Sequence, residues 1–399
     1  MEQKTRIKGN VHYVGVNDRN KHRFEALWPL PYGVSYNSYL IDDEMVALVD
    51  TVDICYFEVY LRKIKQVIGE RPINYLIINH MEPDHSGSIA LIKKYYPEIV
   101  LVGNKKTFEM VEGYYGVTGE RYVVGDGDFL KLGHHSLRFY LVPMVHWPET
   151  MVTFDETEGI LFSGDAFGCF GALNGGCIDR NINTDIYWNE MRRYYANIVG
   201  KFGNPVQKAL QKCGGLPIKT ICPTHGPVWE ECIPQVVDMY DKLSRYEGEE
   251  GVVIVYGTMY GNTEELAEAI AEELSAQGIK NIILHNVSHT HHSYILADIF
   301  KYKALIAGCT TYNMQLYPEM ESLLSKVAAR EMKNRLFGYF GSFTWASAAV
   351  KKLGEFTEKL KFEVVGNPVE MKQSMKADNY AQAKELAKAM ADRLKADRK

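Results

Sequence analysis

The chain has 399 residues, of which 46% are hydrophobic and 24% charged, so it is long enough for two or three packed domains and too apolar to be disordered. Its 45 Lys and Arg against 50 Asp and Glu give a net charge of −5, which argues against binding to nucleic acid or to an anionic membrane. The sequence has no apolar run of membrane-spanning length and no apolar signal segment at its polar N-terminus, so we expect a cytoplasmic protein. The seven cysteines are scattered and form no C-x-x-C pair, which argues against a disulfide framework or a cysteine-ligated metal.

The first part of the chain predicts strands interspersed with helices. In chain order, we expect strands at 11–16, 35–41 and 45–50, a helix at 56–68, a strand at 73–79, a helix at 86–95, strands at 99–102, 136–142, 150–154 and 160–163, helices at 185–199 and 205–211, and a strand at 218–222. Asn204 is the expected N-cap of the helix at 205–211, with Pro205 in its first position.

A charged, glycine-containing stretch at 244–251 interrupts this pattern and predicts a joint between two domains, 1–248 and 249–399. After the joint, we expect strands at 251–256, 282–284, 304–307, 335–339 and 362–365, with a helix at 263–277, further helices between the strands and a terminal helix from Tyr380. Five strands that alternate with helices predict a doubly wound parallel sheet.

A dense group of potential metal ligands follows the apolar strand at 73–79: His80, Glu82, Asp84 and His85. Three more candidate ligands, His146, Asp165 and His225, also follow predicted strands. A single histidine is more often structural, but side chains at the ends of several strands in one domain can converge on one point. The sequence therefore predicts a metal site made by these seven residues.

A second candidate site lies in the predicted C-terminal domain. The loop at 257–263 joins a strand to the start of a helix, where free backbone N–H groups and the helix dipole favour a phosphate. Because the loop has neither the lysine of a P-loop nor a G-x-G-x-x-G pattern, a monophosphate fits better than ATP or NAD. The predicted cofactor-binding residues lie in this loop and after the next two strands: Thr258, Met259, Tyr260, Gly261, Asn262, Thr263; Thr310, Thr311, Tyr312, Asn313; Gly341, Ser342, Phe343, Thr344 and Trp345.

These motifs resemble two known families. The histidine and carboxylate pattern is similar to that of the metallo-β-lactamase-like superfamily, which implies an N-terminal αββα sandwich of the α+β type. The three loops of the second domain resemble flavodoxin, an α/β fold with a five-stranded parallel sheet that binds FMN, although Tyr260 stands where many flavodoxins have threonine. Glu82 replaces a histidine of the hydrolases, and a carboxylate there favours iron over zinc.

In this order, over essentially the full length, the motifs resemble the flavodiiron proteins. The resemblance implies that His80, Glu82, His146 and Asp165 hold one iron, and that Asp84, His85, Asp165 and His225 hold the other. It implies that electrons pass from FMN to the two irons, where O2 is reduced to water, NO to N2O, or both. It also implies that Tyr195 lies near the irons and that the protein is a head-to-tail homodimer or a dimer of dimers.

The absence of a C-x-x-C pair near residue 399 predicts no fused rubredoxin domain, so the electron donor should be external, such as a separate rubredoxin or a reduced deazaflavin. Two alternatives stay open at this point. One is a zinc-dependent hydrolase fused to a flavodoxin module, and the other is an electron carrier whose metal domain is inactive. Glu82 argues against the first, and the retention of all seven candidate ligands argues against the second.

Overall fold

The structure is a computed structural model that describes residues 5–397, so residues 1–4 and 398–399 of the predicted domains lie outside the described residues. The chain divides into two compact units, of which the first ends at Asp241 and the second begins at Lys242. This division falls inside helix α7 (Ile233–Ser244), a few residues before the boundary expected at 248. Within residues 5–397, no helix has both the length and the apolar character needed to cross a membrane.

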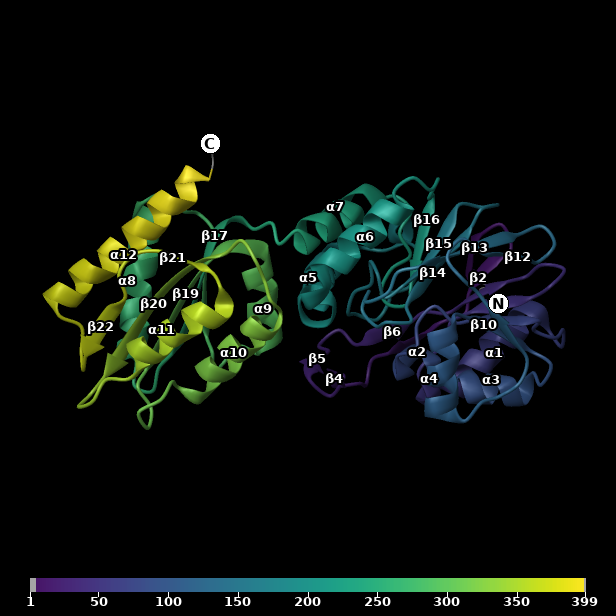
Figure 1. The fold of residues 1–399 in the computed structure, drawn as a ribbon, viewed down its shortest axis with the longest axis horizontal. Coiled ribbons are helices and arrows are strands. Elements are labelled where there is room, and N and C mark those ends of the chain that lie inside the picture. The colour runs from purple at the N-terminus through teal and green to yellow at the C-terminus, as the bar shows by residue number, and fades with distance from the viewer. Residues whose placement is uncertain (1–4, 398–399) are drawn as a thin grey trace. The chain divides into compact units, whose positions relative to one another are not determined.

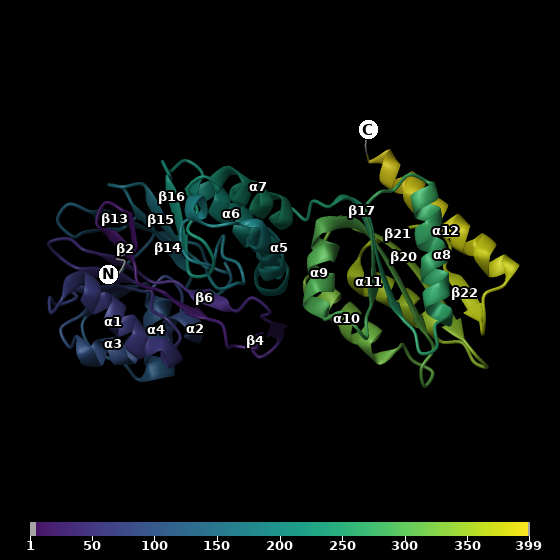
Figure 2. The same ribbon diagram turned by 180° about the vertical axis from the view of Figure 1, so that it is seen from behind.

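The first unit is a sandwich of two sheets with helices on its outer faces (Figure 1). In the described residues, the larger sheet has the order β1-β2-β7-β8-β9-β10-β11 and the smaller sheet the order β12-β13-β14-β15-β16. Helices α1, α3 and α4 lie outside the larger sheet, and α6 and α7 lie outside the smaller one (Figures 1 and 2). The predicted αββα sandwich is therefore confirmed.

The bounds of the elements in the first unit are as follows. The larger sheet contains β1 (Thr5–Lys8), β2 (Val11–Tyr13), β7 (Tyr39–Ile41), β8 (Ala47–Val49), β9 (Tyr75–Ile77), β10 (Val100–Gly103) and β11 (Arg121–Val123). The smaller sheet contains β12 (Phe129–Lys131), β13 (Ser136–Leu141), β14 (Met151–Asp155), β15 (Ile160–Gly164) and β16 (Thr220–Pro223). Two short antiparallel pairs are formed by β3 (Val16–Asp18) with β6 (Val34–Tyr36) and by β4 (Arg23–Phe24) with β5 (Trp28–Pro29). The helices are α1 (Phe57–Ile68), α2 (Pro83–Ser86), α3 (Ile89–Tyr95), α4 (Lys105–Tyr115), α5 (Asp185–Tyr194), α6 (Gly203–Cys213) and α7.

The helices of this unit differ from expectation in several places, and the helix expected at 86–95 is split into α2 and α3. Helix α5 continues into a π-helical turn at Tyr195–Val199 and a 3-10 turn at Gly200–Phe202, and the chain enters α6 directly from there. The prediction that a helix begins at Pro205 with Asn204 as its N-cap is therefore wrong, since Phe202 occupies the N-cap position. Helices α4 and α7 were not predicted, although Asn104 caps α4 by accepting hydrogen bonds from the backbone N–H groups of Lys106 and Thr107.

The second unit is a parallel sheet with the strand order β18-β17-β19-β20-β21, and β22 pairs with β20 beyond β21. Its strands are β17 (Glu249–Gly257), β18 (Ile282–Asn286), β19 (Tyr302–Thr310), β20 (Leu336–Phe343), β21 (Glu363–Val364) and β22 (Val369–Lys372). Its helices are α8 (Asn262–Ala276), α9 (His292–Lys301), α10 (Pro318–Ala329), α11 (Ala349–Leu360) and α12 (Ala377–Ala396). Helices α8 and α12 pack side by side on one face, and α9, α10 and α11 cover the other (Figure 2).

β21 and β22 occupy successive stretches of one edge position, so the predicted doubly wound five-stranded sheet is confirmed with an interrupted last strand. The interruption contains Gly366, whose φ of +74° favours glycine, and Pro368, which has no N–H for a strand ladder. At the start of β20, the buried Arg335 side chain donates to the carbonyl oxygens of Ile299 at 2.9 Å, Phe300 at 2.7 Å and Tyr246 at 2.6 Å. Arg335 thereby joins the first residues of this unit to its sheet.

A buried ion pair in the first unit predicts a pH dependence of stability. His135 Nδ1 lies 2.8 Å from Asp155 Oδ2. Burial disfavours the charged imidazole, but the hydrogen bond and charge of Asp155 outweigh it and raise the pKa of His135. Because the folded-state pKa exceeds the unfolded value of about 6.5, protonated His135 stabilises the fold below that pH, and this contribution is lost as the pH rises through the folded-state pKa.

We therefore expect the stability advantage of the wild type over His135→Asn to be larger at about pH 6 than at about pH 9. Thermal unfolding of both proteins across this range measures it, with the exposed neighbour His134→Asn as the matched control. An advantage that does not change with pH, or that grows toward alkaline pH, would contradict the prediction.

Candidate metal centre

Four of the candidate ligands come from the segment that follows β9. The side chain of Asp50 fixes the start of this segment, because it accepts hydrogen bonds from the backbone N–H of Asn79 at 2.8 Å and from its side-chain amide at 3.0 Å. The single-turn helix α2 then begins with Pro83 and carries Asp84 and His85. All four side chains are buried, so this segment presents two imidazoles and two carboxylates in the interior.

The carboxylate of Asp165, just after β15, lies between two pairs of histidines. Its Oδ2 atom is 3.0 Å from His146 Nε2 and 3.5 Å from His80 Nε2. Its Oδ1 atom is 3.2 Å from His85 Nε2 and 3.7 Å from His225 Nε2. The two oxygens of one carboxylate therefore face two separate positions, each with two imidazole nitrogens.

Each histidine pair also has a carboxylate of its own. Glu82 Oε2 lies 3.1 Å from His146 Nε2 and 3.7 Å from His80 Nε2. Asp84 Oδ2 lies 3.2 Å from His225 Nε2, and its Oδ1 lies 3.5 Å from His85 Nε2. The structure thus brings together all seven residues predicted from the sequence, and it arranges them as two half-sites that share Asp165.

The buried polar atoms of the site fit bound cations. The atoms without a hydrogen-bond partner among the described residues include Nε2 of His80 and His225, both ring nitrogens of His85 and both carboxylate oxygens of Asp84. Burying such atoms unpaired costs free energy, whereas a metal ion at each half-site would satisfy them. The ligand-type atoms of two overlapping groups lie within 4.8 Å of one another: His80, Glu82, His85 and Asp165; and Asp84, His85 and His225.

The charged side chains of the site stabilise one another. Burial disfavours charged His85, but Asp84 and Asp165 outweigh it and raise its pKa to about 9. Burial acts the same way on His146, whose pKa Asp165 and Glu82 raise to about 9. For Asp165, the nearby histidines overcome burial and hold the pKa of the carboxyl well below its usual range. The Asp165 carboxylate is therefore ionised, and a metal ion would bind by displacing protons from the imidazoles of His85 and His146.

Aromatic side chains surround the ligands. The Trp147 ring lies edge-on to His80, with 5.2 Å between ring centroids. The ring of Tyr194 lies 5.7 Å from that of His225, and its buried hydroxyl has no hydrogen-bond partner among residues 5–397. Tyr195, the tyrosine singled out in the sequence, is also buried, but its ring packs against Tyr240 with a centroid separation of 5.1 Å.

The predicted cofactor-binding loops of the second unit lie together at the carboxyl ends of the adjacent strands β17, β19 and β20. Thr263 Oγ1 and Ser342 Oγ are 2.8 Å apart, which joins the first loop to the third. Thr311 in the second loop accepts hydrogen bonds from the backbone N–H groups of Ala348 and Ala349. Tyr260 and Trp345 are each 88% exposed, so both present aromatic surface to a ligand or to another chain.

The start of α8 fits a phosphate group. Gly261, with φ +92°, is the N-cap residue, and no side chain of the described residues caps the first turn. Thr258 Oγ1 accepts a hydrogen bond from the N–H of Gly261 at 3.0 Å and keeps its hydroxyl at this turn. Free N–H groups at a helix N-terminus in a doubly wound sheet match the phosphate of a flavin mononucleotide.

Residues 34–226 match the family described as ODP family beta lactamase, and residues 254–389 match the flavodoxin family. The rubredoxin-oxygen oxidoreductase of Megalodesulfovibrio gigas is 32% identical over 99% of both chains. The nitric oxide reductase of Moorella thermoacetica is 31% identical over 92% of this chain and 93% of its own. The flavodiiron protein from Giardia intestinalis superposes with a TM-score of 0.93 at 26% identity, covering 99% of this chain and 98% of its own.

The chain belongs to the flavodiiron proteins. It is an oxidoreductase of this type, from a family that reduces O2 or NO, and it has a buried metal site of histidines and carboxylates. Its flavodoxin domain implies FMN, and its cluster of ligands is consistent with a di-iron site.

Three groups that orient the ligands of this flavodiiron protein were not predicted. Glu149 Oε1 lies 2.7 Å from His80 Nδ1, the Ser35 carbonyl oxygen lies 2.7 Å from His225 Nδ1, and Thr224 donates a short hydrogen bond to Asp165. The first two bonds direct the Nε2 atoms of His80 and His225 toward the half-sites, as partners of metal-bound histidines do, and the third holds the Asp165 carboxylate in place. Proximity in sequence was the available signal for Thr224, which precedes His225, and for Glu149, which follows His146 closely.

The contact between Glu149 and His80 gives a prediction for metal affinity. Glu149→Gln keeps the size of the side chain but removes the charge that fixes the Nδ1–H form of His80, so we expect metal binding to weaken by about 10- to 100-fold. Competition with a chelator measures the affinity, and the exposed Glu156→Gln is the control. Equal affinities for the wild type and Glu149→Gln would rule out an orienting role.

Proposed function

We propose that this flavodiiron protein passes electrons from FMN in the second unit to a di-iron site in the first, where O2 is reduced to water, NO to N2O, or both. The observation that carries the proposal is the position of Asp165, whose two oxygens face the pairs His80–His146 and His85–His225. A carboxylate shared in this way supports two metal ions bound side by side. In the proposal, Glu82 completes the first half-site and Asp84 the second.

The donor set favours iron. Four imidazoles and three carboxylates, with no cysteine, form a mixed nitrogen and oxygen set of the kind found in non-haem iron centres. Once bound, the flavin supplies electrons and the two irons supply the positions at which a diatomic molecule binds and is reduced. A metal analysis that finds zinc and no iron would instead support the hydrolase alternative.

The residues of this chain have three tasks in the proposal. The seven ligands hold the metals, and the loops at 258–263, 310–313 and 341–345 hold FMN. A tyrosine at the metal site donates a hydrogen bond or a proton to the reduced substrate. Tyr195 is the tyrosine that the family resemblance indicated, and Tyr194 is the better placed, because its ring contacts His225 and its hydroxyl is buried without a partner in the described part of the chain. Burial and the charge of Asp165 raise the pKa of Tyr194, so its hydroxyl keeps its proton.

The proposal includes an external electron donor and a homodimer. A separate rubredoxin or a reduced deazaflavin would suit as the donor, and the name of the Megalodesulfovibrio gigas relative supports rubredoxin. A head-to-tail homodimer, alone or within a dimer of dimers, would bring the flavin of one chain to the irons of its partner. The exposed Tyr260 and Trp345 at the flavin loops are compatible with such an interface. A fully active monomer in analytical ultracentrifugation would contradict this part of the proposal.

The deciding experiment is stopped-flow reoxidation of anaerobically reduced protein, loaded with iron and FMN, by O2 and by NO in parallel. Fast reoxidation by O2 with slow or inhibited reaction with NO would identify an oxygen reductase. Fast formation of N2O together with damage by O2 would identify a nitric oxide reductase. Failure with both gases would refute the proposal.

A further inference from the structure

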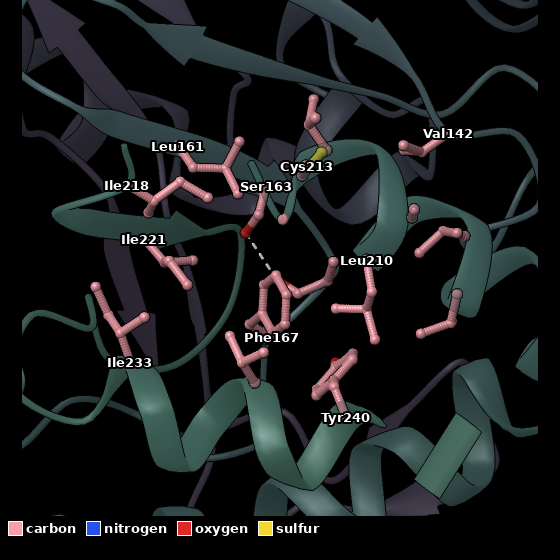
Figure 3. A pocket seen from close by; sticks show the side chains of 17 residues that line it. Val142, Leu161, Ser163, Phe167, Leu210, Cys213, Ile218, Ile221, Ile233 and Tyr240 are labelled. Carbon is pink, nitrogen blue, oxygen red and sulfur yellow. Dashed lines mark hydrogen bonds between the residues drawn. The ribbon is translucent and has the colours of Figure 1, made fainter. Parts of the chain in front are cut away.

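A hydrophobic cavity lies in the first unit between the smaller sheet and helices α6 and α7 (Figure 3). Its volume is about 110 Å³. Helix α6 contributes Val206, Ala209, Leu210 and Cys213, which lie on one face of the helix at the spacing of successive turns. The floor is formed by side chains of β14, β15 and β16, and Tyr240 of α7 closes the far side. Neither the metal site nor the flavin loops explain this space.

The lining offers almost nothing to which water can bind. Ser163 is the polar exception on the sheet, and its hydroxyl donates to the carbonyl oxygen of Ala166 at 2.7 Å (Figure 3). A cavity is occupied by water when several polar partners face it, whereas an apolar cavity of about 150 Å³ stays dry and takes up xenon or benzene. The lining therefore suits a small uncharged molecule.

At one end of the cavity, lining residues are direct neighbours of metal ligands in the chain. Val145 lines the cavity and directly precedes His146, and Ala166 and Phe167 line it and directly follow Asp165. The Phe167 ring packs on Tyr240 with 4.7 Å between centroids, so this end is buried. The opposite end lies at the C-terminus of α6, where Gly214 is exposed and Cys213 and Ile218 are half-buried. The lining thus extends from the surface to the turn that carries the shared carboxylate.

We propose that this cavity binds the diatomic gas substrate and delivers it to the metal site from the side of α6. The proposal rests on the proposed function, because only a gas-consuming centre gives the cavity this role. O2 and NO are small and uncharged, so their transfer from water into an apolar cavity is favourable. The cavity holds the gas beside the turn at 165–167 and raises its local concentration there.

The first test needs no enzymatic activity. Crystals of the wild-type protein under xenon pressure are expected to show xenon in this cavity, and Ala209→Phe, which fills the space, is expected to abolish that peak. Lys208→Phe, on the exposed side of the same helix, is the matched control and should keep the peak. Absence of xenon from the wild-type cavity would overturn the proposal whether or not the protein reacts with O2 or NO.

The second test measures delivery. The second-order rate constant for reoxidation of the reduced, loaded protein by O2 or NO is expected to fall about tenfold in Ala209→Phe, equivalent to roughly 1.4 kcal/mol on the barrier, and to be unchanged in Lys208→Phe. Iron and FMN contents should match the wild type in both. If Ala209→Phe does not fold, Ala209→Leu takes its place.

An unchanged rate constant in a variant that has lost the xenon peak would overturn delivery through the cavity. A wild type that binds xenon but reacts with neither gas would instead refute the proposed function itself.

Discussion

Asp165→Asn is expected to abolish stable binding of both metals while FMN binding stays intact. The shared carboxylate faces both histidine pairs, and the amide that replaces it presents one neutral oxygen and one NH2 group. Loss of a hydrogen-bond partner that only orients a metal ligand lowers metal affinity by about 10- to 100-fold. Loss of a side chain that binds both metals directly should therefore lower the affinity of each half-site by more than that. Iron content after equal loading, measured together with flavin absorbance, reports both outcomes in one sample.

Asp155→Asn is the matched control for this experiment. Asp155 is also a buried carboxylate in contact with a histidine, but it lies at the far end of β14 and pairs with His135. It should keep its metals even if the protein is less stable. Retention of one tightly bound iron in Asp165→Asn would show that the two half-sites are independent, which is contrary to the shared arrangement.

Arg335→Met is expected to destabilise the flavin-binding unit by roughly 2–4 kcal/mol, because it removes the donor from three carbonyl oxygens, each of which costs about 1–3 kcal/mol when it is buried and unsatisfied. The substitution also removes the free-energy cost of burying a charged guanidinium, which offsets part of this loss. That cost is evident from the pKa of Arg335, which burial lowers to about 10. Methionine fills much of the same volume, so the change tests the hydrogen bonds more than the packing.

Urea unfolding followed by the fluorescence of released FMN measures this effect. Arg393→Met is the control, because Arg393 pairs with Glu363 on the surface and its loss should change the midpoint far less. A midpoint for Arg335→Met equal to that of the control would show that the three carbonyl oxygens find other partners.

The sequence was most informative about residues that can bind a metal or a cofactor and that also lie at the ends of strands. His80, His146, Asp165 and His225 all follow strands, and parallel or neighbouring strands that end at the same edge of a sandwich bring such residues together. That the three predicted cofactor loops lie together was predictable for the same reason, since β17, β19 and β20 are neighbours in the sheet. These arguments depend on the order of elements and tolerate errors of a few residues at their ends.

The sequence did not predict which residues of a helix face the site or where some helices begin. The turn at Tyr195–Val199 is π-helical, so spacing based on an α-helix cannot decide which of two adjacent tyrosines faces the ligands. The start of α6 was misplaced because Pro205 and Asn204 form a good local signal, whereas the preceding turns already lead the chain into the helix. Glu149 was missed because its contact with His80 joins segments that are remote in the sequence.

The interrupted last strand of the parallel sheet also has a consequence for self-association. An edge strand with a continuous row of open backbone groups can template pairing with other chains and start aggregation. Here Gly366 and Pro368 break that row between β21 and β22, the side chain of Asn379 donates to the Glu370 carbonyl oxygen at 3.1 Å, and Arg393 binds Glu363 beside β21. This edge of the parallel sheet is thereby protected from the addition of a strand from another copy of the chain.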